Sequence, residues 1–327
     1  MQFDSKKMLI TGGLGHIGSH IIRFQTGSTV IDDLSTQRYC SIFRIDPDLP
    51  QNDAGSFIFL HRDFDSLTVE ELSKFDIVIH LAAITDAANS FNDRDRVERI
   101  NVVKTVDLIH KATDAGVKLF IFPSSTSVYG NGDAIMTEDN PDCINPQSPY
   151  AEAKIKIEEK LRCSGLRYII LRFGTIFGTS PGMRFHTAIN KFCFQACMGE
   201  PLTVWKQNFY HKRPYLALDD MRRAINLFVG AFTGLELNRG LITPSAINQI
   251  YNVVSENRTL NEVIQMICEE IGDASSLIIN MVDTPLLNQH SYEVDFSKIS
   301  KLGYDPGTNI RFGIRDTIRL LSRIKPA

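Results

Sequence analysis

The sequence has little that would suit a membrane or a nucleic-acid partner. Its 327 residues include 35 basic and 38 acidic side chains, a net charge of −3 at pH 7. That balance does not supply the broad cationic face that nucleic acid or an anionic membrane requires. The N-terminal residues lack the apolar core of a signal peptide, and an apolar run of about 18 residues is absent. These absences predict a cytoplasmic protein.

Cysteine and histidine lack the spacing of a metal site. The six cysteines include no Cys-x-x-Cys pair, so neither a zinc ribbon nor a disulfide scaffold is indicated. Cys193 and Cys197 are four residues apart, as are His16 and His20, but a third ligand does not follow either pair. We therefore expect reduced thiols and no metal.

The pattern of apolar residues predicts an α/β fold. Apolar residues make up 43% of the chain and charged residues 22%, which fits a sizeable core. Through residue 175, short apolar runs alternate with longer stretches of helical spacing, as in βαβ units around a doubly wound parallel sheet of Rossmann type. The expected strands are 7–11, 28–32, 57–61, 77–81, 119–124 and 168–173. The expected helices are 68–75, 93–115 and 149–163.

After residue 178 the alternation becomes irregular, which predicts a smaller, mixed α/β C-terminal substrate domain. The expected elements there are helix 187–198, strands 201–205 and 215–220, and helices 221–232 and 259–271. We assign 1–175 to the dinucleotide-binding domain, with 213–240 returning to it. The substrate domain would then comprise 176–212 and 241–327.

Three glycines separate the first expected strand from a helical stretch. A tight turn requires Gly12, close approach of a pyrophosphate to the backbone requires Gly15, and packing of the helix on the strand requires Gly18. The N-terminus of the following helix supplies N–H donors and a favourable dipole. The motif therefore predicts a dinucleotide site.

An acidic side chain ends the second expected strand. Asp32 lies 20 residues after Gly12 and is followed by Asp33. A carboxylate at this spacing accepts hydrogen bonds from the adenosine ribose and repels a 2′-phosphate, which favours NAD over NADP. The alternative is that both residues merely start a turn. Asp63, after the third strand, is a further candidate for contact with adenine.

A phenol and an ammonium lie on one face of the helix expected at 149–163. Tyr150 and Lys154 are four residues apart, and Pro149 sets the start of the helix. A phenol is a poor base at pH 7, but a neighbouring ammonium favours phenolate, so Tyr150 can take a proton from a substrate hydroxyl. Ser125, where the fifth strand ends, offers a hydroxyl to the same oxygen, because strand ends meet at one edge.

Five motifs together resemble the extended short-chain dehydrogenase/reductases, in the NAD-dependent epimerase/dehydratase branch. They are 12–18, 81–83, 124–130, Tyr150 with Lys154, and 171–178. The resemblance implies bound NAD, a nucleotide-sugar substrate and a homodimer. It makes Ser125 and Tyr150 the hydroxyl and the base of a catalytic triad, and Lys154 the residue that binds the nicotinamide ribose and tunes the tyrosine.

The resemblance also implies ligand contacts. The cofactor would contact Gly12, Gly15, His16, Ile17, Gly18, Asp32, Asp33, Asp63, Phe64, Leu81, Ala82, Ala83, Tyr150, Lys154 and Phe173. The substrate would contact Thr126, Thr175, Val204 and Arg213. A second arginine that the family places on the pyrophosphate is absent, and His211, Lys212 or His290 are candidate replacements.

The turn after Ser125 favours one reaction within this branch. Relatives that eliminate water or carbon dioxide resemble one another in carrying acidic residues there, whereas this chain has Thr126 and Ser127. Without a carboxyl group beside the ketosugar, elimination lacks its general acid and base, so a nucleotide-sugar 4-epimerase is expected. The alternatives are a 4-dehydrogenase or reductase with net redox, and a non-catalytic NAD-binding regulatory protein.

Overall fold

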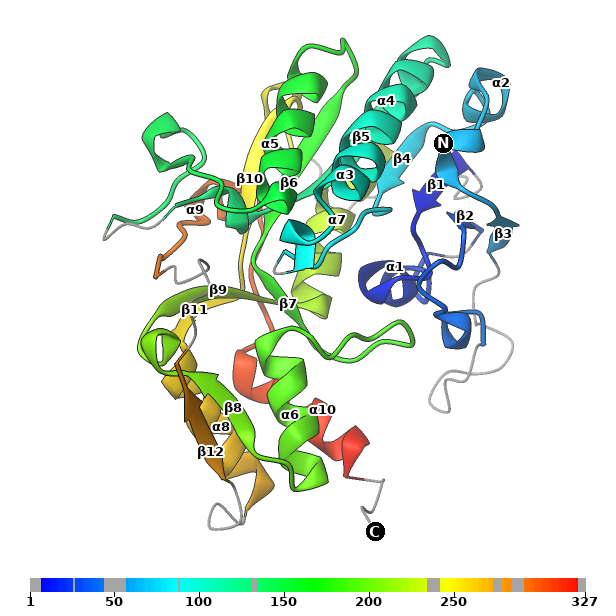
Figure 1. Ribbon diagram of the computed structural model, residues 1–327. Coiled ribbons are helices and arrows are strands. Elements are labelled where there is room, and N and C mark those ends of the chain that lie inside the picture. Colours follow the sequence, from blue (N-terminus) through cyan, green and yellow to red (C-terminus); the bar gives the residue numbers. More distant parts are fainter. Residues whose placement is uncertain are drawn as a thin grey trace.

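The computed structural model describes residues 7–25, 27–43, 57–87, 89–130, 134–233, 242–272, 278–283 and 291–322. Its largest element is a parallel sheet of seven strands in the order β10-β6-β5-β4-β1-β2-β3 (Figure 1). The strands are β1 (Met8–Thr11), β2 (Thr29–Asp32), β3 (Ile58–His61), β4 (Ile77–His80), β5 (Leu119–Ser125), β6 (Tyr168–Phe173) and β10 (Gln249–Val253). The order reverses between β1 and β4, as in a doubly wound dinucleotide-binding sheet, so the predicted fold class is confirmed.

The two faces of the sheet have separate cores. On one face, alternate residues such as Met8 and Ile10 pack with α1 (His16–Ile21), α7 (Leu218–Thr233) and α9 (Ser297–Ser300). On the other, Leu9 and its equivalents pack with a second set of helices. These are α2 (Val69–Leu72), α3 (Arg94–Val97), the π-helical stretch η5 (Glu98–Lys104), α4 (Thr105–Asp114) and α5 (Pro149–Arg162). Period-two alternation of buried residues explains why both faces are covered.

A second group of elements lies beyond the carboxyl ends of the strands, in the lower part of Figure 1. A three-stranded sheet joins β7 (Thr175–Phe177), β9 (Lys212–Ala217) and β11 (Glu256–Thr259), and β8 (Leu202–Trp205) pairs with β12 (Ile279–Val282). The helices packed with these strands are α6 (Ala188–Met198), α8 (Leu260–Ile271) and α10 (Ile310–Leu321). This mixed unit faces the edge where β4, β5 and β6 end.

The structure differs from the sequence-based elements at several places, including the following three. The helix expected at 93–115 is divided by the π-helical turns of η5. The strand expected at 215–220 is β9, which starts earlier, and α7 already begins at Leu218. Strand β10 was not predicted. It lies in a segment that we assigned to the substrate domain, yet it pairs with β6 in the main sheet. The rest of the domain division stays a prediction.

Two further features concern membrane segments and cysteines. In the part of the chain that the structure describes, no helix is long and apolar enough to cross a membrane. All six cysteines are free thiols.

Candidate active site

The glycine loop is a tight turn between β1 and α1. Gly12 has φ +64°, and its N–H donates to Ile31 O at 2.8 Å. A Cβ on Gly12 would lie 2.6 Å from Ala82 Cα, so a larger residue would collide with the backbone after β4. Gly15 precedes α1 and Gly18 touches Gly13. This close-packed turn, which leads into a helix N-terminus, suits the pyrophosphate of a dinucleotide.

The Asp32 carboxylate lies beside the glycine loop. Its Oδ2 accepts from Leu14 N at 3.1 Å and its Oδ1 from Leu34 N at 2.9 Å. The pKa of Asp32 lies above its ordinary value, because the effect of burial outweighs these two hydrogen bonds and the positive charge of Arg38. Asp33 is exposed, and its carboxylate accepts from Ser35 N at 2.9 Å. Asp32, rather than Asp33, therefore joins the loop to the end of β2.

We expect Asp32→Asn to lose preference for NAD over NADP. The amide keeps the side chain's shape but removes the charge that repels a 2′-phosphate, and Arg38 is close enough to Asp32 to attract that phosphate. Wild type should prefer NAD by at least about tenfold, or about 1.4 kcal/mol. Calorimetric titration of both cofactors measures this ratio, with Asp33→Asn as the matched control. Equal affinities in wild type would contradict the ribose role.

Other residues expected to contact the cofactor lie around the ends of β3, β4 and β6. Asp63 forms an ion pair with Lys104, and Phe64 is buried against His80 with ring centroids 4.9 Å apart. The side chain of Phe64 is therefore a core residue. Leu81 N donates to Thr11 O at 3.0 Å, which holds the 81–83 segment against the glycine loop. Phe173, at the end of β6, is buried in the same core as Ile17.

Ser125 and Tyr150 come together at the end of β5. The Ser148 hydroxyl accepts from Ala151 N and caps α5, with Pro149 in its first turn, and this places Tyr150 at the start of the helix. The Ser125 side chain hydrogen-bonds to Tyr150. The pKa of Tyr150 is raised, because the effect of burial outweighs the opposing effects of the Arg184 charge and of the hydrogen bond with Ser125. A hydroxyl and a phenol thus share one site, as the sequence predicts.

Lys154 lies near Tyr150, with its Nζ 5.6 Å from the centre of the Tyr150 ring, and its effect on the phenol stays a prediction. Its Nζ donates to Pro123 O at 2.7 Å and lies 4.5 Å from the centre of the Phe122 ring. The charge of Arg184, which the sequence argument did not consider, also acts to lower the pKa of Tyr150. Burial lowers the pKa of Lys154 to about 8, although the charge of Glu158 raises it. The part of the expectation that concerns the nicotinamide ribose stays a prediction.

Tyr292 links two residues that the sequence assigned to the substrate. Its hydroxyl lies 3.4 Å from Thr126 Oγ1, and the guanidinium of Arg213 lies 5.5 Å from the centre of its ring. Tyr292 itself is buried. Sequence reasoning missed Tyr292 because no motif surrounds it. The contacts bring the turn after β5 and strand β9 to one place.

Thr175 and Val204 lie on strands of the second unit. Thr175 pairs with Tyr215 across β7 and β9 and is partly exposed. Val204 on β8 is 1% exposed and packs in the core of that unit, so only its backbone is available to a ligand. The expected contact of Val204 with substrate stays a prediction, and it would have to use the backbone of β8.

Lys212 and the described histidines lie in different surroundings. Lys212 forms an ion pair with Glu293, which neutralises it. Burial is the main cause that lowers the pKa of His211. His16 lies 2.8 Å from Ser180 Oγ and His20 lies 3.2 Å from Asp219 Oδ1. His290 is outside the described residues.

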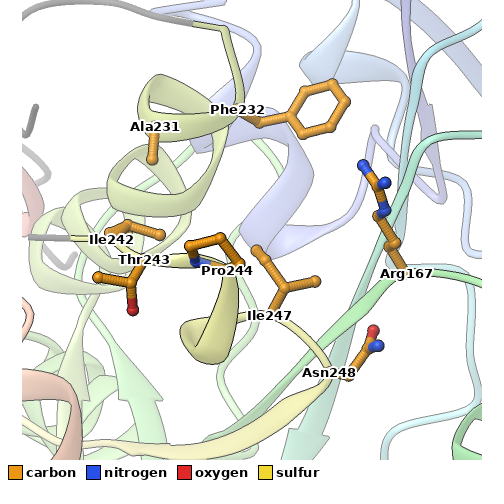
Figure 2. A pocket seen from close by; sticks show the side chains of 8 residues that line it. All are labelled: Arg167, Ala231, Phe232, Ile242, Thr243, Pro244, Ile247 and Asn248. Atoms are coloured by element: carbon orange, nitrogen blue, oxygen red, sulfur yellow. The ribbon is translucent and has the colours of Figure 1, made fainter. Parts of the chain in front are cut away.

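A pocket of about 430 Å³ lies at the opposite edge of the main sheet (Figure 2). Arg167 and Asn248, which line it, precede β6 and β10, whereas Ser125 is the last residue of β5. The other lining residues are Ala231, Phe232, Ile242, Thr243, Pro244 and Ile247. The pocket is therefore separate from the site that contains Tyr150.

Residues 8–238 match the model of the NAD dependent epimerase/dehydratase family. The UDP-glucose 4-epimerase of Azospirillum brasilense is 29% identical over 283 residues, which cover 79% of this chain and 78% of that protein. A trifunctional UDP-glucose 4,6-dehydratase/UDP-4-keto-6-deoxy-D-glucose 3,5-epimerase/UDP-4-keto-L-rhamnose-reductase of Arabidopsis thaliana is 27% identical over 97% of this chain. This chain spans 47% of that relative's length.

Solved structures share the fold over nearly the whole chain. MoeE5 in complex with UDP-glucuronic acid and NAD has 26% identity and a TM-score of 0.76, covering 97% of this chain and 99% of that one. The UDP-glucose 4-epimerase of Thermotoga maritima, solved with UDP-glucose, has 23% identity and a TM-score of 0.77. The alignment covers 97% of this chain and 98% of the Thermotoga chain.

Proposed function

Because this chain belongs to the NAD-dependent epimerase/dehydratase family, we propose that it is a nucleotide-sugar 4-epimerase. The observation that carries the proposal is the turn after β5, which lies beside Tyr150. Its residues Ser125, Thr126 and Ser127 offer hydroxyls and no carboxylate. A site of this kind can move the proton of a sugar hydroxyl, but it does not provide the acid and base needed for elimination.

The residues of the glycine loop and the β2 end fit an NAD molecule. The backbone of Gly12 approaches Ala82 too closely for a side chain, and Asp32 stands beside the loop with its charge partly buried. Bound NAD supplies the acceptor for the C4 hydride and its donor in the return step. The family to which this chain belongs is also NAD-dependent.

The protein's own groups handle the proton and the position of the sugar. Tyr150 takes the proton of the C4 hydroxyl, and Ser125, which lies beside Tyr150, offers its own hydroxyl to the same substrate oxygen. Arg213, next to Tyr292, binds the pyrophosphate, so the oxidised sugar can turn about that fixed end. Tyr150 then returns the proton to the oxygen, and the overall reaction involves no net redox.

One experiment separates the proposed 4-epimerase reaction from its alternatives. UDP-glucose and UDP-glucuronic acid are the probes, each incubated with the holoenzyme in deuterated solvent and followed by NMR. We expect the C4 epimer of a turned-over sugar, no deuterium at C4 or C5, and no accumulation of NADH, because the hydride returns internally.

The other results would contradict the proposal in distinguishable ways. Deuterium at C5 together with loss of water would indicate a dehydratase. NADH formed in proportion to product would indicate a dehydrogenase. Binding of NAD and nucleotide-sugar by mass spectrometry, without turnover of either probe, would favour a regulatory protein. The homodimer implied by the family resemblance stays a prediction.

A further inference from the structure

The segment between β7 and α6 bridges the ends of three strands of the main sheet. We call residues 178–187 the strap, and it runs toward α1 (Figure 1). The strap contacts residues that follow β1, β2 and β4, and the strand order reverses between β1 and β4. A doubly wound sheet binds its dinucleotide outside the strand ends at such a reversal. The strap therefore borders the expected cofactor site.

The strap is hydrogen-bonded to the glycine loop and to α1. Ser180 Oγ donates to His16 O at 2.9 Å and lies 2.8 Å from His16 Nδ1. Gly182 N donates to Ser19 Oγ at 2.9 Å. A Cβ on Gly182 would lie 2.5 Å from Leu14 O, so a side chain at this position would push the strap away from the loop. Hydrogen bonds and a close backbone approach thus seat the strap on the loop.

Further contacts join the strap to the segments after β2 and β4. Arg38, which follows β2, donates to Gly182 O and, at 3.0 Å, to Met183 O. Thr85, which follows β4, accepts at its Oγ1 from Arg184 Nη1. Because the strap is attached at three strand ends, it can lift only when several hydrogen bonds break together.

A buried asparagine on α6 gives the strap a closed shape. Asn190 is fully buried. Its Oδ1 accepts from Gly178 N at 3.0 Å, and its Nδ2 donates to Arg184 O at 3.1 Å. One side chain thus ties the start of the strap to a residue near its end, as in a compact loop whose ends lie close together. We therefore expect the strap to move as one unit.

The strap covers only one side of the glycine loop. Its partners Leu14, His16 and Ser19 are buried, whereas Gly12 and Gly15 are partly exposed. The backbone N–H groups of such a loop and of the helix after it hold a pyrophosphate. The strap therefore lies against the loop and leaves its exposed side open to the cofactor.

We propose that Ser180 and Gly182 are positioning residues that act through the glycine loop, seating the strap there so that bound NAD is retained. The family to which the chain belongs depends on NAD. Lifting of the strap would then limit the release of the cofactor, as lid opening limits release in many enzymes. Retention serves an epimerase, because the reduced cofactor must stay until the hydride returns. That benefit rests on the proposed function, whereas retention itself does not.

Exchange of bound NAD in the absence of sugar tests the proposal. The holoenzyme is loaded with isotope-labelled NAD and mixed with a large excess of unlabelled NAD, and mass spectrometry follows the label that stays bound. This measures the rate of release. Equilibrium dialysis of the same holoenzyme against a series of NAD concentrations gives Kd, and the release rate divided by Kd gives the association rate.

Two variants loosen the strap in different ways. Ser180→Ala removes the side-chain contacts with His16 without adding bulk, and Gly182→Ala pushes the strap away from Leu14. Each should speed release by roughly tenfold, as expected when hydrogen bonds that hold the closed form are lost. Kd should rise by less than the release rate, because an open strap does not slow association. Gly230→Ala on α7 is the matched control and should leave release unchanged, since a Cβ there would have no neighbour within 4 Å among the described residues.

Release from Ser180→Ala at the wild-type rate would overturn the proposal, whether or not Gly182→Ala folds. Slower association with unchanged release would also overturn it, because the two residues would then shape the loop rather than retain the cofactor. A wild type that binds no NAD would contradict both this proposal and the cofactor of the proposed function. If wild type releases NAD slowly, Ser180→Ala releases it faster and neither probe sugar is converted, the proposed reaction fails while retention by the strap stands.

Discussion

Tyr150→Phe should lower turnover by on the order of a hundredfold to ten-thousandfold, the range expected when a general base is removed. The substitution keeps the ring and removes the oxygen that bonds to Ser125. Cofactor binding should persist, because the glycine loop and Asp32 are unaltered. Steady-state rates with the probe sugar and the NAD content of the purified protein measure the two effects.

Ser125→Ala is the matched comparison for this variant. It removes the hydrogen bond to Tyr150 but leaves the phenol, so its loss should be smaller and should depend on pH. A Tyr150→Phe protein that retains near wild-type turnover with NAD bound would show that another group carries the proton.

Arg172→Met should destabilise the fold by about 3–5 kcal/mol, the cost of leaving one partner of a buried ion pair unpaired. Arg172 Nη2 lies 2.6 Å from Glu158 Oε2, and both side chains are 4% exposed. Arg172 also donates to Tyr129 at 2.9 Å, while Ser124 donates to Glu158 at 2.5 Å. The free energy of unfolding in urea, measured at one NAD concentration, gives the loss.

Two further variants separate the cost of an unpaired charge from the loss of packing. Glu158→Gln combined with Arg172→Met removes both charges and should recover part of the stability. Arg94→Met breaks the exposed pair between Arg94 and Glu152 and should cost less than about 1 kcal/mol. A loss in Arg172→Met no larger than that of Arg94→Met would contradict the role of the buried pair.

The parts of the site that depend on local sequence could be predicted. The glycine turn, the acid at the end of β2 and the position of Tyr150 on α5 follow from short motifs at strand ends, and β6 lies where the apolar run placed it. The direction of Lys154 could not be predicted, because Pro123 O and the Phe122 ring lie on β5 and only the packing of α5 on that strand brings them near.

Contacts between residues far apart in the sequence could not be predicted either. Tyr292 lies 166 residues from Thr126 in the chain and meets it only in the folded protein. The segment between β7 and α6 resembles an ordinary loop in sequence, yet its Gly182 lies so close to Leu14 that a Cβ would collide with the Leu14 backbone. Helical spacing at 93–115 did not reveal the π-helical η5, since its seven residues are too few to show a period of their own.

The pairing of β10 with β6 has a consequence for the order in which the protein can form during synthesis. Gln249 pairs with Ile169, so the seventh strand emerges from the ribosome long after the other six strands of its sheet. Until then the edge of β6 presents unpaired backbone groups, which another chain could occupy. The dinucleotide-binding half is therefore completed only by residues made late, and nascent chains carry an open edge in the interval.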